Sequence, residues 1–133
     1  MDAPVSRETT RATFLHSEPQ LFVSAIEAAI DFYAALGFEP RFKYGEPSFY
    51  AQIVRDQVRL NLRHADGSIF DATFRVREPD ALSATIVVDD AEALFREYRE
   101  RGVAFFQDLR SEPWGARTFI VADPDGNLLL FAG

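Results

Sequence analysis

The sequence predicts an α+β fold in which a β-α-β-β-β module is used twice to build a cupped, mostly antiparallel mixed sheet. Two observations carry this prediction. The segment VSAIEAAIDFYAALGF (23–38) aligns with VDDAEALFREYRERGV (88–103), and similar strand-like segments surround each copy. The chain has 133 residues, of which 47% are hydrophobic, so it suits one domain with a substantial core.

Each aligned segment is expected to form an amphipathic helix that ends at a glycine. Apolar residues recur at the spacing of one helical face. Gly37 and Gly102 suit the left-handed position that terminates a helix. The apolar stripes are Ile26, Ala29, Ile30 and Tyr33 in the first copy, and Ala91, Leu94, Phe95 and Tyr98 in the second.

Strand-like segments stand before and after each helix. PQLFVS precedes the first helix and SATIVV the second, and three further segments follow each helix. The last two of these bracket a tight turn, at Arg55-Asp56-Gln57 and at Pro124-Asp125-Gly126. In chain order the following segments are FEPRFKYG, SFYAQIV and QVRLNLRH, then VAFFQDL, ARTFIVA and GNLLLFAG.

These elements divide the chain into four parts. Residues 1–17 are expected to be a flexible N-terminal arm, and residues 18–65 and 83–133 to form the two modules. The linker, residues 66–82, contains ATFRVR, which could pair as an added edge strand.

The charge balance and the cysteine count exclude several functions. A formal net charge of −7 disfavours nucleic acid as a partner and favours cationic ligands. The absence of cysteine excludes disulfides, thiolate catalysis and cysteine metal sites. No segment is apolar for long enough to span a membrane, and no signal peptide is visible, so we expect a cytoplasmic protein.

The motifs IDFYAALGF, VVDDAEALFREYRERG and PWGARTFIVADPDGNLLLF together resemble the vicinal oxygen chelate superfamily, which contains glyoxalases, bleomycin resistance proteins and dioxygenases. The Pro-then-apolar first strand, the hairpin RDQV (55–58) and PWG (113–115) look most like bleomycin resistance proteins. The resemblance implies the glyoxalase/bleomycin resistance fold, often within a homodimer, with sites inside the cups.

Metal-dependent members of this superfamily place one ligand on each of four inward-facing strand positions, usually His, Glu, His and Glu. Counting from the shared motifs, these positions fall on Glu18, Asn61, Ser83 and Leu130. Leucine has no donor atom, so we predict that the ordinary metal centre is lost and that the protein has no cofactor. If the register of the strands is shifted by one residue, Gln20 or Thr85 occupies an inward position in place of one of these four. If the protein holds a metal ion after all, its ligands are expected to be His16, Glu18 and His64.

Strand alternation then predicts the lining of the cup. Apolar and polar groups mix in it, which suits an organic ligand. No carboxylate pair or His–carboxylate couple emerges at catalytic spacing, so no catalytic residue is predicted. Trp114 is either a stacking wall or a packed loop residue, and Arg117 binds a ligand carboxylate or pairs with Glu112. The predicted ligand-binding residues are Gln20, Phe22, Phe49, Arg59, Asn61, Arg63, Thr85, Trp114, Arg117, Leu128 and Leu130.

The first hypothesis for function is therefore a metal-independent small-molecule binding protein of the bleomycin-resistance type. It would sequester a ligand, with a cationic antibiotic as candidate, in a cup shared by two subunits. Arg59 and Arg63 inside the cup work against a cationic ligand. One alternative is a lyase, isomerase or dioxygenase with an atypical metal set. Another is a dimeric domain that binds a host metabolite or has a regulatory role.

Overall fold

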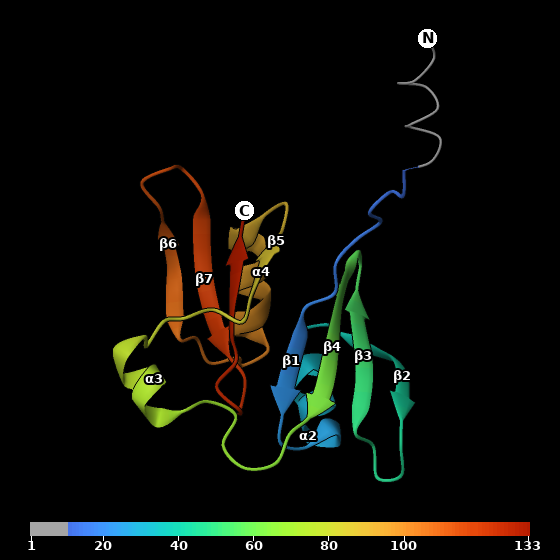
Figure 1. The fold of residues 1–133 in the computed structure, drawn as a ribbon. Coiled ribbons are helices and arrows are strands. Elements are labelled where there is room, and N and C mark those ends of the chain that lie inside the picture. The colour runs from blue at the N-terminus through green and yellow to red at the C-terminus, as the bar shows by residue number, and fades with distance from the viewer. Residues whose placement is uncertain (1–10) are drawn as a thin grey trace.

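The computed structural model describes residues 11–133, and they form two modules of the same topology (Figure 1). The part of the predicted N-terminal arm in residues 1–10 lies outside the described residues. Residues 11–17 are an exposed coil. The first module comprises β1 (Gln20–Val23), α2 (Ile26–Ala35), β2 (Glu39–Tyr44), β3 (Tyr50–Arg55) and β4 (Val58–His64). The second comprises β5 (Ala84–Val87), α4 (Ala91–Glu100), β6 (Gln107–Ser111), β7 (Arg117–Ala122) and β8 (Leu128–Ala132).

Each module contains a mixed four-stranded sheet, which confirms the predicted fold class. The strand orders are β1-β4-β3-β2 and β5-β8-β7-β6. In both sheets the first strand of the module pairs in parallel with the last, and the other pairs are antiparallel. The parallel pair follows from the helix, which crosses over between the first strand and the three-stranded meander.

The helix ends show how local sequence sets these boundaries. Gly37 and Gly102 follow α2 and α4 with φ of +91° and +80°, so both have the predicted left-handed conformation. Asp90 caps α4 by accepting a hydrogen bond from the backbone N–H of Ala93 at 3.0 Å.

The linker differs from the prediction. ATFRVR forms helix α3 (Ala72–Arg77) and not an edge strand. Asp71 accepts a hydrogen bond from the N–H of Phe74 at 3.1 Å, and this N-cap favours a helical turn over extended chain.

One hydrophobic core lies between the sheets and the helices and joins both modules. It includes Leu21, Tyr33 and Leu60 of the first module and Tyr98 and Phe119 of the second. On β1 and β4 the side chains of the core, such as Leu21 and Leu60, alternate with side chains that point away from α2. We call the face of the first sheet away from α2 the first open face, and the face of the second sheet away from α4 the second open face.

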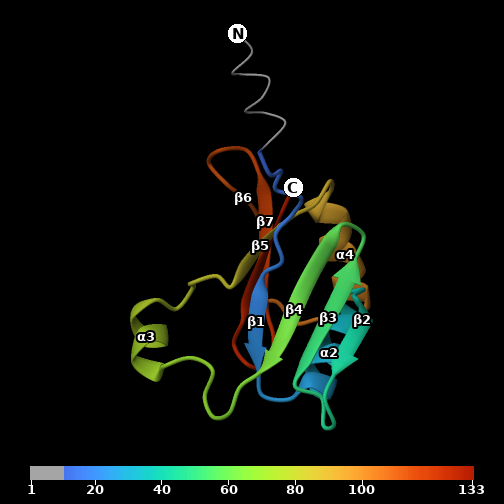
Figure 2. The same cartoon turned by 45° about the vertical axis from the view of Figure 1, so that its right-hand side comes forward.

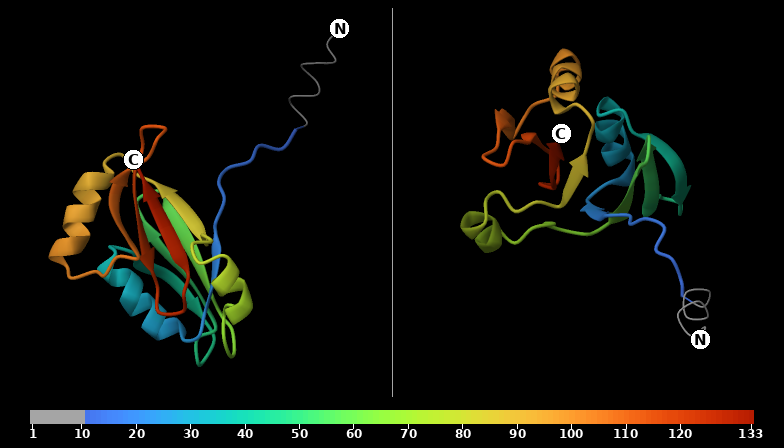
Figure 3. Two further views of the ribbon diagram at one scale, coloured as in Figure 1. Left: turned by 90° about the vertical axis from the view of Figure 1, so that its left-hand side faces the viewer. Right: turned by 90° about the horizontal axis from the view of Figure 1, so that it is seen from above.

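The two open faces diverge. The modules contact each other through their helix sides: the Tyr98 hydroxyl donates to the Leu36 carbonyl at 2.7 Å, and Arg101 donates to the Ala35 carbonyl at 3.1 Å. Seen from above, α2 and α4 lie toward the same side and the sheets splay apart (Figure 3). Turning the molecule by 45° brings the first open face into view (Figure 2). The two predicted halves of a cup therefore do not face each other within one chain.

A loop at the end of β7 adds a second connection between the modules. The buried Asp123 carboxylate accepts from the Tyr33 hydroxyl at 2.9 Å and from the Asn127 side-chain amide at 2.8 Å. Asn127 also donates to the Phe22 carbonyl on β1 at 3.0 Å. Burial raises the pKa of Asp123, although these hydrogen bonds oppose the shift.

Candidate functional site

The centre of the first open face is a closed network of hydrogen bonds. Gln52 on β3 and Asn61 on β4 are buried, and they lie side by side in the sheet register. The Gln52 amide donates to Asn61 at 2.9 Å and to Glu18 at 3.0 Å, and the Asn61 amide donates to the same Glu18 oxygen, Oε1, at 3.2 Å. Arg41 donates to the side-chain oxygen Oε1 of Gln52 at 2.9 Å. Each buried amide therefore has partners.

The second oxygen of Glu18 faces two basic side chains. His16 Nε2 lies 2.6 Å from Oε2, and the Arg59 guanidinium lies 3.9 Å from it. The hydrogen bonds from His16 and then Asn61 lower the pKa of Glu18 below its ordinary value. The sequence-based expectation that no His–carboxylate couple forms was wrong. The coil before β1 has no periodicity from which this contact could be read.

An aromatic and basic region lies beside this network. Phe22 and Arg63 are neighbours across β1 and β4, and the Arg63 guanidinium lies 5.6 Å from the centre of the Phe22 ring. Tyr50 flanks Arg63 from β3 and donates its hydroxyl to Gln20 at 3.1 Å. Tyr50 also stacks on Phe42, with ring centres 6.4 Å apart. The structure therefore brings Gln20, Phe22, Asn61 and Arg63 together, with Arg59 along the same strand.

The second open face is more apolar. Leu130 lies beside Thr85 of β5, and Leu128, two residues earlier on β8, is buried. The opposing strand β7 adds Ile120, which pairs with Leu130. At the β6–β7 end, Glu112 accepts from the Thr118 hydroxyl at 2.7 Å and from Arg110 at 3.0 Å. The hydrogen bonds from Thr118 and then Arg110 lower the pKa of Glu112.

Two predicted ligand-binding residues lie elsewhere. Arg117 is on the helix side of β7, where it pairs with Glu92 of α4 at 3.1 Å and not with Glu112. Phe49 does not face the cup, because its ring lies against the turn at Gly45, and Tyr50 takes the inward position.

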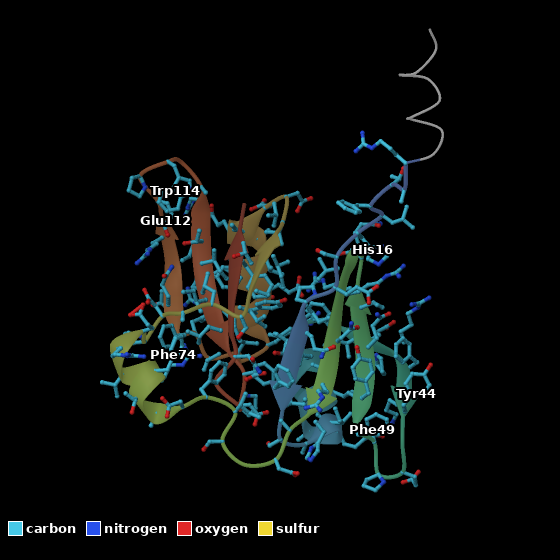
Figure 4. All side chains as sticks on the ribbon, in the orientation of Figure 1. His16, Tyr44, Phe49, Phe74, Glu112 and Trp114 are labelled. Carbon is cyan, nitrogen blue, oxygen red and sulfur yellow. The ribbon has the colours of Figure 1, made fainter. Side chains whose placement is uncertain are left out.

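Trp114 is 74% exposed on the β6–β7 loop, so it does not pack as a buried loop residue (Figure 4). His64 pairs with Asp66 at the end of β4.

Several contributors to the open faces were missed by sequence reasoning. Gln52 lies between the core residues Ala51 and Ile53, so strand alternation along β3 could have found it. Arg41 had no such signal, because its partner Gln52 comes from the neighbouring strand, and Glu112 lies just after β6, outside any alternating strand.

The four inward positions do not fit a metal ion. Glu18 and Asn61 are in contact, but both Glu18 oxygens are already engaged by protein donors. Ser83 donates its hydroxyl to Asn127 at 3.0 Å, and Leu130 offers no donor atom. Across residues 11–133, no three His, Cys, Asp or Glu side chains come together as a metal site would require.

A separate cavity of about 370 Å³ lies at the junction of the modules. Neither the Gln52–Asn61–Glu18 network nor the Glu112–Thr118 pair lines it. It is lined by the β3–β4 turn, the β5–α4 connection and core residues including Phe38, Leu94 and Phe131. Of the predicted ligand-binding residues, none lines it. Within the described residues, no helix has the length and apolar character of a membrane span.

Known structures share this architecture. The bleomycin-binding protein from the bleomycin producer Streptomyces verticillus, complexed with copper(II)-bleomycin, is 27% identical, with a TM-score of 0.72 over 91% of this chain and 97% of that one. Another bleomycin-binding protein complexed with bleomycin is 18% identical, with a TM-score of 0.69 over 90% of this chain and 98% of that one. A glyoxalase-related enzyme from Clostridium phytofermentans is 15% identical, with a TM-score of 0.71 over 92% and 97%.

Sequence comparison assigns the family. None of the curated proteins compared with this chain matches it significantly. The model of the glyoxalase/bleomycin resistance protein/dioxygenase superfamily matches residues 13–131, nearly the whole chain. This match, the repeated module and the neighbouring structures agree, and they confirm the resemblance predicted from the motifs. The chain belongs to the glyoxalase/bleomycin resistance protein/dioxygenase superfamily.

Proposed function

We propose that this protein is a metal-independent small-molecule binding protein that sequesters an organic ligand. The observation that carries the proposal is that the residues at the four inward positions are either already hydrogen-bonded to other protein groups or have no donor atom for a metal. Glu18 is hydrogen-bonded by Gln52, Asn61 and His16, and Leu130 replaces a donor with a hydrocarbon. A cup of this kind offers apolar contact and hydrogen bonds without a Lewis acid, which suits binding without turnover.

The complete cup, in this proposal, forms between two copies of the chain. The two open faces diverge, and exposed apolar side chains such as Phe22 and Val87, 40% and 78% exposed, stand on them. A homodimer in which the first open face of one copy meets the second open face of the other would cover both. Such a dimer has two equivalent cups, each with a polar wall and an apolar wall.

A bleomycin-like antibiotic is the first candidate ligand, and its sequestration would protect the host cell in proportion to the amount of protein. Support comes from the two similar bleomycin-binding proteins, one of them 27% identical. Trp114, exposed at the β6–β7 loop, would then stack on a flat part of the ligand.

The first experiment titrates Ni²⁺, Zn²⁺, Mn²⁺ and Fe²⁺ into metal-stripped protein by calorimetry and repeats the titration on Leu130→Glu. We expect no stoichiometric binding by the parent tighter than about 10 μM, since three to four good donors are needed for a stable site. Leu130→Glu should gain affinity, because it adds a carboxylate to the wall opposite Glu18. One tightly bound ion per subunit of the parent would refute metal independence.

A second experiment titrates bleomycin into the chelator-treated protein and follows sedimentation. We expect one ligand per cup, an unchanged ligand after release, and a dimer at the concentrations used. Binding that requires a metal, or a changed ligand, would support the alternative: a lyase, isomerase or dioxygenase of the same superfamily. The His16–Glu18 contact at 2.6 Å is the one observation that favours this alternative, because a carboxylate-bound imidazole is a typical general base.

A further inference from the structure

The charges on the first open face have the opposite sign to the charge of the whole chain. The formal net charge is −7, but on the first open face Arg41, Arg59 and Arg63 outnumber two carboxylates, Glu18 in the network and Glu39, which pairs with Val54 at the edge of the sheet. On the second open face, Glu112 is paired with Arg110 and adds no excess negative charge. A cup made of these two walls is therefore basic inside.

Two of these arginines retain donors for a ligand. Arg59 approaches Glu18 only at 3.9 Å, beyond hydrogen-bond distance, and Glu18 Oε2 is occupied by His16 at 2.6 Å. Arg63 makes one long hydrogen bond, 3.3 Å, to the neighbouring His64 carbonyl. A guanidinium carries five N–H donors, so most donors of both side chains stay open. Arg59 and Arg63 stand four residues apart on β4, with Asn61 midway between them, and all three point to the same face.

The surroundings of Arg63 indicate the shape of the group it would hold. Phe22 and Tyr50 lie on either side of it in the sheet register, and Tyr50 continues the aromatic surface to Phe42. A guanidinium next to aromatic rings binds an aromatic carboxylate or sulfonate well, because two oxygens of the acidic group accept two hydrogen bonds while the attached ring stacks on the aromatic side chains.

We propose that the cup recognises an aromatic organic anion, whose acidic group is held by Arg63, with Arg59 as a second positive charge on the same strand, and whose ring lies between Phe22, Tyr50 and the apolar wall at Leu130. This inference rests on the proposed function and narrows it, because it disfavours a ligand that is only cationic. A zwitterionic ligand would bind with its acidic end on the first open face.

The test uses the full chain and two fluorescent probes of opposite charge. The probes are 8-anilinonaphthalene-1-sulfonate, an aromatic anion, and thioflavin T, an aromatic cation. Binding is measured for the wild type, for Arg59→Gln/Arg63→Gln, and for the control Arg77→Gln/Arg99→Gln, which removes the same charge from helices α3 and α4. The charge-retaining Arg59→Lys/Arg63→Lys variant tests for misfolding.

We expect saturable binding of the anion at one probe per subunit. The Arg59→Gln/Arg63→Gln variant should weaken it at least tenfold, the control less than twofold, and the lysine variant should keep most of it. Equal weakening in both glutamine variants would overturn the inference, because it would show a net-charge effect. Stoichiometric binding of the cation alone would also overturn it, while leaving the binding function intact. If neither probe bound saturably, the inference would fail, and the bleomycin titration described above would decide the proposed function separately.

Discussion

Arg55 on β3 donates two hydrogen bonds to the carboxylate of Glu97 on α4, at 2.9 and 3.1 Å, and so ties the first module to the second. A third hydrogen bond runs from the Arg55 guanidinium to the Leu36 carbonyl at 2.9 Å. The hydrogen bonds with Glu97 raise the pKa of Arg55, and those from Arg55 lower the pKa of Glu97. Because this pair stands at the module junction, it helps to hold the two open faces apart.

A double-mutant cycle on Arg55→Ala and Glu97→Ala measures the strength of this tie. Both side chains are about 30% exposed, so we expect a coupling free energy of about 1 kcal/mol in urea unfolding. The exposed pair Arg96–Glu92 on α4 is the matched control, and its coupling should be roughly 0.3–0.5 kcal/mol. Equal couplings would mean that Arg55–Glu97 is an ordinary surface pair.

The equivalent glycines of the two modules should respond differently to alanine. Both have a positive φ, so each substitution should cost about 1–2 kcal/mol. A Cβ on Gly37 would also lie 2.6 Å from Arg55 Nη1, whereas nothing lies within 4 Å of a Cβ on Gly102. Gly37→Ala should therefore lower the free energy of unfolding more than Gly102→Ala. The Gly37 penalty should shrink in an Arg55→Ala background, and an unchanged penalty would exclude the clash as its cause.

Removing the buried hydroxyl of Tyr33 should destabilise the chain. In Tyr33→Phe, Asp123 loses a hydrogen bond of 2.9 Å in a buried site, and we expect a cost of about 1–3 kcal/mol. Burial already raises the pKa of Asp123, and this loss should raise it further, so the penalty should be smaller at acidic pH, where the carboxyl is neutral. Urea unfolding over a pH series from 8 down to 3 measures this, with the exposed Tyr44→Phe as control. A penalty that grows on acidification would contradict the argument.

Acid should weaken the fold partly through Glu18. Its pKa is lowered in the folded state, so its contribution is present above the unfolded value, roughly 4.3, and is lost as the pH falls through the folded value. Glu18→Gln keeps an acceptor for Gln52 and Asn61 but removes the titration. Urea midpoints between pH 3 and pH 7 should therefore change less steeply in this variant. A slope identical to that of the wild type would show that Glu18 does not contribute.

The fold was predictable because its signals are local. Helical stripes such as Ile26–Tyr33 and the glycine after each helix depend only on neighbours in sequence, and both appear in the structure as expected. The exception is α3, where the alternation of ATFRVR is typical of a strand. Asp71 stabilises a helix there, because its side chain is the N-cap and accepts a hydrogen bond from the backbone N–H of Phe74.

The site was less predictable because its contacts cross between strands and modules. Alternation along β4 placed Asn61 on the open face, and the network around it confirms that orientation. The partner of Arg117 could not be deduced, because Glu92 comes from a helix distant in sequence. The divergence of the open faces also had no local signal, since it depends on the packing of Tyr98 against Leu36 across the module junction.

The splayed arrangement of the sheets makes the proposed function depend steeply on protein concentration. If each cup needs one wall from each of two chains, a diluted subunit carries two halves of different sites and no whole one. At protein concentrations below the dissociation constant of the dimer, the number of complete cups rises with the square of the protein concentration. A cell with little of the protein would then have almost no capacity to capture the ligand, and a modest rise in expression would produce a disproportionate gain.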